Sequence, residues 1–131
     1  NMSGNEQTLP TELGTIKISD DVVSIIAGLA AMEIEGVAAM SGGIVGGIAE
    51  VLGRRNLAKG VKVEVGAEEC NIDLFVIIRY GARIPDVCWS VQESVKKAVE
   101  NMTGLCVLQV NVHVQGISFP QKEEAAGKEA D

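Results

Sequence analysis

Two segments in the middle of the chain have the pattern of a β-hairpin. Residues 61–65 (VKVEV) alternate apolar and polar side chains, as a strand with one buried face does. Residues 70–80 (CNIDLFVIIRY) are almost continuously apolar, which is typical of a central strand. The four residues between them, 66–69 (GAEE), predict a turn. A chain built on this pair must bury at least one face of a sheet.

Two amphipathic segments predict helices that cover this sheet. The first runs from Val22 to Ile34, where apolar residues recur at helical spacing. The second begins near Pro85, which suits the first turn of a helix, and ends at Gly104. It has a stripe on one face, and we expect this stripe to pack against alternate residues of the central strand. The expected contact joins Val91, Val95 and Val99 to Leu74, Val76 and Ile78.

Shorter strand patterns complete the predicted fold. They lie at residues 15–18, 37–40 and 107–114. The resulting order, β-α-β-β-β-α-β, predicts an α+β domain. We expect a mixed sheet of four to five strands with two helices packed on one face.

The 131 residues allow one domain of ordinary size. Residues 1–13 are polar and aperiodic, and we expect a disordered leader there. Residues 14–119 form the predicted folded domain. Residues 120–131 are charged and rich in small side chains, which predicts an acidic disordered tail.

Composition restricts the classes of partner. The formal net charge of −7 argues against general affinity for nucleic acid. No apolar run reaches the roughly 18 residues of a transmembrane helix, so we expect no transmembrane segment. The three cysteines, Cys70, Cys88 and Cys106, show no CxxC spacing. We interpret them as core residues of a protein in the reducing cytoplasm, with no metal site and no cofactor.

The face of the sheet opposite the helices is the main candidate for function. If Leu74 points at the helices, strand geometry sends Phe75 and Ile77 to the other side. Charged and polar side chains surround them there: Lys62, Glu64, Asp73, Arg79, Gln109, Asn111 and His113. Large apolar side chains among charged ones are typical of an interaction face. An ordinary solvated sheet face is the alternative.

A glycine-rich stretch, residues 41–60 (SGGIVGGIAEVLGRRNLAKG), is the second candidate. It lacks the GxxxxGK[ST] and dinucleotide-binding patterns, so a connection that becomes ordered on a partner is favoured over a phosphate site. A basic island formed by Arg54, Arg55, Lys59 and Lys62 begins in this stretch and extends into the strand that follows. This island could bind an acidic protein, anionic lipid or RNA, or pair with nearby glutamates.

Catalytic residues are not indicated. His113 is flanked by valines, and no nucleophile or third partner is identifiable in the sequence. The acidic pairs at 20–21, 68–69 and 123–124 lie at a helix start, a turn and a tail. None of them suggests two carboxylates held across a pocket.

Four segments together resemble the alkaline shock protein family of Gram-positive bacteria, also called the general stress protein family. They are residues 14–43 (GTIKISDDVVSIIAGLAAMEIEGVAAMSGG), 52–65 (LGRRNLAKGVKVEV), 72–105 and 110–117 (VNVHVQGI). They span about 100 residues and follow the family's order. The resemblance implies a non-catalytic cytoplasmic protein linked to stress of the cell envelope, and it brings no catalytic or cofactor residues.

Three functional hypotheses follow from the residues and the resemblance. The leading one is a stress-associated scaffold or adaptor that self-associates and binds other proteins, including a membrane-anchored partner that would place it peripherally at the membrane. The second is a regulator that binds a metabolic enzyme complex such as acetyl-CoA carboxylase. The third is KH-like RNA binding through the glycine-rich loop and the basic island, although the net charge makes nucleic acid an unfavourable partner.

Overall fold

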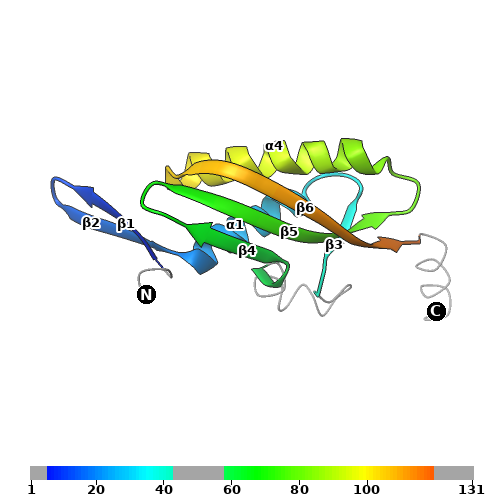
Figure 1. The fold of residues 1–131 in the computed structure, drawn as a ribbon, viewed down its shortest axis with the longest axis horizontal. Coiled ribbons are helices and arrows are strands. Elements are labelled where there is room, and N and C mark those ends of the chain that lie inside the picture. Colours follow the sequence, from blue (N-terminus) through cyan, green and yellow to red (C-terminus); the bar gives the residue numbers. More distant parts are fainter. Residues whose placement is uncertain (1–5, 43–57, 120–131) are drawn as a thin grey trace.

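The fold is a four-stranded sheet with two helices on one of its faces (Figure 1). The computed structural model describes residues 6–42 and 58–119. Its elements are β1 (Glu6–Thr11), β2 (Gly14–Ser19), α1 (Asp20–Met32), β3 (Val37–Met40), β4 (Val61–Val65), β5 (Glu69–Arg79), α4 (Ile84–Thr103) and β6 (Cys106–Ser118). The predicted α+β class and the placement of both helices on one face are confirmed.

Strand β5 is the centre of the sheet. β6 runs parallel to it along one edge, from Glu69↔Cys106 to Arg79↔Ser118. β4 and β3 pair antiparallel with its first and second halves, so they share the other edge. They meet at Phe75, whose backbone N–H donates to the Gly60 carbonyl and whose carbonyl accepts from the Ser41 N–H.

The core lies between the sheet and the helices. Every second side chain of β5 faces the helices, and Leu74, Val76 and Ile78 are fully buried there. Val91, Val95 and Val99 of α4 are also fully buried, in the same apolar cluster. The predicted burial of these two stripes in one core is confirmed, and with it the direction of the β5 side chains.

The ends of α4 follow from its sequence. Pro85 occupies the first turn, where a missing N–H removes no helical hydrogen bond. Gly104 ends the helix in a left-handed conformation, with φ of 80°, and donates its N–H to the Glu100 carbonyl.

Residues near the N-terminus differ from the prediction. Within 1–13 we expected no regular structure, but residues 6–11 form β1 and pair with β2 from Glu6↔Ser19 to Thr11↔Gly14. This hairpin is separate from the four-stranded sheet and extends away from it (Figure 1). Residues 1–5 of the predicted leader and the whole of the predicted tail, residues 120–131, lie outside the described residues.

The cysteines occupy three different environments. Cys70 is buried, and burial raises the pKa of its thiol to about 11, with smaller contributions from Cys106 and Glu100. The thiol is therefore protonated at neutral pH, as expected for a core residue. Cys88 is partly buried, and Cys106 is exposed because it begins β6 at the end of the sheet. The prediction of three core cysteines is wrong for Cys106.

Candidate functional site: the open face of the sheet

The open face is the side of the main sheet that the helices leave uncovered. Phe75 and Ile77 point to it from β5 and are partly buried, whereas Arg79 at the end of the strand is exposed. Lys62 reaches the same face from β4, where it lies opposite Asp73 in the β4–β5 register. Phe75, Ile77 and Lys62 therefore lie on the same face of the sheet, near its centre.

An aromatic stack lies at the centre of the open face. Phe75 and His113 are neighbours in the parallel β5–β6 register. Their ring centroids are 4.4 Å apart and their planes differ by 11°. The ammonium of Lys62 lies 5.7 Å from the centroid of the Phe75 ring, within the range of a cation–π contact. Three strands thus contribute to one cluster.

Asp73 fixes the histidine of this stack. One of its carboxylate oxygens lies 3.0 Å from Nε2 of His113. The hydrogen bond to His113 is the main reason why the pKa of Asp73 is lowered from its usual value of 3.8. Burial, the second-largest effect, raises this pKa, whereas a hydrogen bond to Asn111 and the charges of His113 and Lys62 lower it further. We refer to Lys62, Asp73, Phe75, Asn111 and His113 as the aromatic cluster.

Beyond the aromatic cluster, a hydrogen bond and a register shift join β6 to the rest of the sheet. The Ser41 hydroxyl lies 2.8 Å from Oε1 of Gln115, which joins the end of β3 to β6 across β5. Gln115 is the extra residue at a register shift, where Val76 pairs with Val114 but Ile77 pairs with Gly116. A Cβ atom at position 116 would be 3.0 Å from the Ile77 side chain, so the glycine lets Ile77 lie close to β6.

The basic island is only partly within the described residues. Arg54 and Arg55 lie outside them, as does most of the glycine-rich stretch. Lys59 is described and lies two residues before the start of β4, and Lys62 belongs to the aromatic cluster. The prediction that these four residues act together is therefore not tested.

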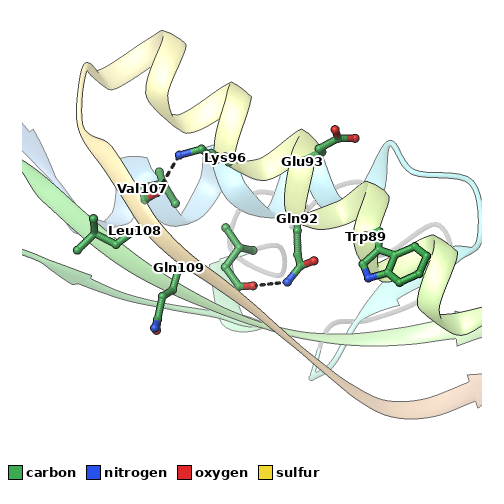
Figure 2. A pocket seen from close by; sticks show the side chains of 8 residues that line it. Trp89, Gln92, Glu93, Lys96, Val107, Leu108 and Gln109 are labelled. Carbon is green, nitrogen blue, oxygen red and sulfur yellow. Dashed lines mark hydrogen bonds between the residues drawn. The ribbon is translucent and has the colours of Figure 1, made fainter.

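A groove that the sequence analysis missed lies between α4 and the edge of β6 (Figure 2). It has a volume of about 470 Å³, and the exposed side chains of Trp89 and Leu108 line it. Gln92 donates to the Val110 carbonyl at 2.9 Å, and Lys96 donates to the Val107 carbonyl at 3.0 Å. The sequence does contain a pattern that could have indicated this groove. Polar residues recur one helical turn apart at positions 92, 96 and 100, each one position after a residue of the buried stripe of α4.

Two further observations concern the described residues alone. Within 6–42 and 58–119, no group of three or more His, Cys, Asp or Glu side chains is placed to hold a metal ion. No helix in the same residues has the length and apolar character needed to cross a membrane.

Comparison with known proteins identifies the family. The model of the alkaline shock protein 23 family, described by a cell envelope-related function, matches residues 8–119. The chain belongs to this family. The family resemblance seen in the sequence is thereby confirmed, and the match extends across most of the segment that forms β1.

Relatives in two bacterial genera match most of this alkaline shock protein 23 family chain. It is 40% identical to YqhY of Bacillus subtilis over 114 residues, which cover 87% of this chain and 84% of YqhY. It is 38% identical to YloU of the same organism over 111 residues, which cover 83% of this chain and 92% of YloU. A Streptococcus pyogenes homologue of the stress response regulator Gls24 is 31% identical over 113 residues, covering 86% of this chain and 63% of the homologue. No solved structure shows a significant match.

Proposed function

We propose that this protein is a non-catalytic, stress-associated adaptor of the cell envelope, which acts through self-association and protein binding on its open face. The observation that best supports this is the stack of Phe75 on His113, with Lys62 and Asp73 beside it. An aromatic centre within a charged and polar rim is the arrangement found in specific protein contacts.

The aromatic cluster is also preorganised. Asp73 binds one nitrogen of His113, and Phe75 covers one face of its ring. A ring held from two sides loses little conformational freedom when a partner covers it, which reduces the entropic cost of association. The same two contacts engage the histidine in holding the surface together, which favours a role in recognition over one in proton transfer.

The family supports the setting of this function. Its description is a cell envelope-related function, and one relative is named a stress response regulator. We place the protein in the cytoplasm, associated peripherally with the membrane through a membrane-anchored protein. Under this proposal the open face binds that protein or a second copy of the chain.

The test is the substitution Phe75→Glu, compared with Ile16→Glu. Ile16 is 52% exposed on the β1–β2 hairpin, so its substitution adds the same charge away from the sheet. Loss of a buried phenylalanine removes about 1.5–3 kcal/mol, so we expect association to weaken by more than about tenfold in Phe75→Glu alone. Sedimentation velocity measures self-association, and circular dichroism confirms that both variants fold.

A pull-down from native lysate with the same variants identifies the partner. Recovery of a membrane protein by wild type and Ile16→Glu, but not by Phe75→Glu, would support the adaptor. Recovery of carboxylase subunits in its place would favour the regulator of an enzyme complex. If folded Phe75→Glu self-associates and recovers partners as wild type does, the open face is not the contact surface.

A further inference from the structure

An apolar groove runs between α1 and α4 on the outer side of the helical layer. Its volume is about 510 Å³. Val22, Ile25 and Leu29 line it from α1, and Ala98 and Met102 line it from α4. Val22 is 44% exposed, Leu29 48% and Met102 70%, so the groove is open to solvent rather than part of the core. We call it the interhelical groove.

The shape of the interhelical groove matches a helix. Val22, Ile25 and Leu29 recur on one face of α1, and Glu33 follows on the same face at the end of the groove. At a rise of 1.5 Å per residue, the distance along α1 from Val22 to Glu33 is about 16 Å, or three turns. Ala98 has a small side chain, which allows close approach on the α4 side. An amphipathic helix that lays its apolar face into such a groove is a recurrent mode of recognition.

The charge along the groove selects the kind of helix. Glu33 lines the far end of the groove, and Asp21 lies outside the lining, one turn before Ile25. No basic residue occurs from Asp20 to Glu35 in the sequence, so the negative pole at the C-terminal end of α1 has no cation in its last turn. Lys97 of α4 lies next to Ala98 but does not line the groove. A second copy packed antiparallel through α1 would bring Asp21 near Glu33, and anionic lipid would meet the same acidic residues.

We propose that the interhelical groove binds a basic amphipathic helix of about three turns from a partner protein. Its apolar stripe covers Val22, Leu29 and Met102, and its basic side chains lie toward the C-terminal end of α1, at Glu33. This surface belongs to the helical layer, on the opposite side of the protein from the open face. The proposal therefore does not depend on the adaptor function of the aromatic cluster.

The test uses two labelled synthetic peptides of about 12 residues, the length that fills the groove at the helical rise. Both have leucines at helical spacing and a side-chain staple that holds the helix. One carries lysines beside the leucine stripe, and the other carries glutamates at the same positions. Fluorescence anisotropy should show that the full chain binds the basic peptide at least about tenfold more tightly than the acidic one, a difference that added salt reduces.

Four variants locate the binding site. Leu29→Gln removes an exposed apolar contact without disturbing the core, and Glu33→Lys reverses the charge at the end of the groove. We expect each to weaken binding of the basic peptide at least about fivefold. Glu93→Lys makes the same charge change on the other side of α4, and Phe75→Glu alters the open face. Neither control should change the affinity, and equal binding of both peptides, or no effect of Leu29→Gln and Glu33→Lys, would overturn the proposal.

Other occupants give different results in the same experiment. If the groove joins two copies, sedimentation of the wild type shows a dimer that Leu29→Gln dissociates. If it binds lipid, vesicles of phosphatidylglycerol co-sediment with the wild type and not with Leu29→Gln. Either result, without preference for the basic peptide, would replace the proposed helix with that occupant.

Discussion

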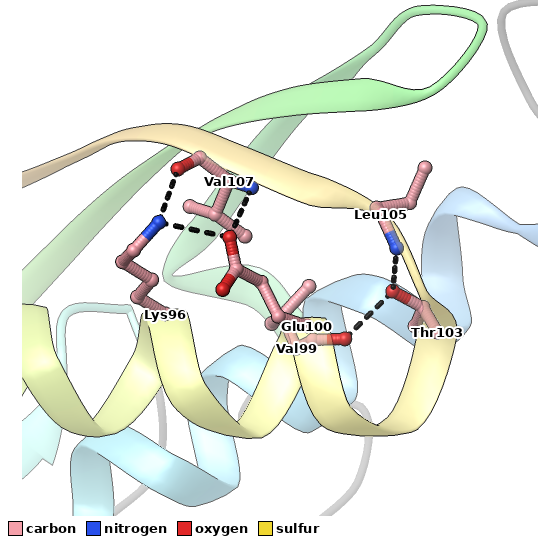
Figure 3. Close-up of polar contacts among 6 residues, drawn as sticks. All are labelled: Lys96, Val99, Glu100, Thr103, Leu105 and Val107. Atoms are coloured by element: carbon pink, nitrogen blue, oxygen red, sulfur yellow. Dashed lines mark hydrogen bonds and ion pairs between the residues drawn. The ribbon is translucent and has the colours of Figure 1, made fainter.

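The carboxylate of Glu100 accepts a hydrogen bond from the backbone N–H of Val107, with 2.9 Å between the nitrogen and Oε2 (Figure 3). The same oxygen lies 2.8 Å from Nζ of Lys96, which also donates to the Val107 carbonyl at 3.0 Å. Two side chains one helical turn apart therefore pair with both backbone groups of one residue on β6. Edge strands with unpaired backbone groups are prone to unwanted pairing, and α4 covers the edge here.

This network predicts that Glu100→Ala lowers the melting temperature at neutral pH, because it leaves the Val107 N–H without its acceptor. Lys96 and then the Val107 N–H lower the pKa of Glu100 below its usual 4.5. The contribution of the carboxylate is thus present above pH 4.5 and is lost as the pH falls through the lowered pKa. Calorimetry across this range should show the difference between variant and wild type shrinking toward acid pH. Glu93→Ala, an exposed substitution on the same helix, is the control, and a difference independent of pH would contradict the assignment.

The contact of α4 with the sheet predicts the effect of Val95→Asp. Val95 is fully buried in the core between the helices and the sheet, so the variant would place an unpaired carboxylate there. We expect a loss of more than about 3 kcal/mol in the free energy of unfolding. Urea denaturation measures it, and Glu93→Asp introduces the same residue on the exposed side of α4. A midpoint of Val95→Asp equal to that of the control would mean that α4 does not pack as described.

The sequence was sufficient to place the central strand and its faces. The nearly continuous apolar run at 70–80 predicted the strand, and strand geometry put Leu74 and Phe75 on opposite faces because consecutive side chains of a strand alternate. It did not reveal β1, since Pro10 interrupts the pattern and the partner strand β2 lies outside the main sheet. Nor did it give the full length of β6, because the extra residue at Gln115 breaks the alternation that resumes at Ile117.

The contacts of the candidate site depended on pairings that no local pattern encodes. The stack of Phe75 on His113 requires the parallel register of β5 and β6, which are separated in the chain by α4. The sequence predicted that both residues share a face, but the register determines that they touch. The hydrogen bond between Ser41 and Gln115 likewise depends on which edge of β5 each strand occupies.

Gly36 is predicted to be irreplaceable for two separable reasons. Its φ is 107°, and a Cβ there would be 2.6 Å from Cγ2 of Val87, at the contact between the β3 approach and α4. Gly81 has a similar φ of 97° but nothing within 4 Å of a Cβ, so Gly81→Ala measures the backbone cost alone. We expect about 1–2 kcal/mol for Gly81→Ala and about 1–3 kcal/mol more for Gly36→Ala.

The double substitution Gly36→Ala with Val87→Ala tests the steric part of this difference. Removing the valine methyl groups relieves the clash, so the double variant should lose less stability than the sum of the two single variants. Thermal or urea denaturation of the four proteins gives the coupling. Strict additivity would show that Val87 does not limit the space at Gly36.

The last prediction concerns the charge that holds the aromatic cluster together. His113 is the main cause of the lowered pKa of Asp73, so His113→Ala should raise that pKa toward 3.8. Because the folded pKa lies below the unfolded one, ionised Asp73 stabilises the fold above pH 3.8, and this stabilisation is lost as the pH falls through the lowered pKa. Carbon-13 NMR of the carboxyl group gives the pKa directly in wild type and variant. Asn111→Ala, which removes a weaker contribution, should raise the pKa by less. A pKa of Asp73 that stays the same in His113→Ala would show that the histidine does not bind the carboxylate in solution, and the aromatic cluster would lose its means of fixing the ring.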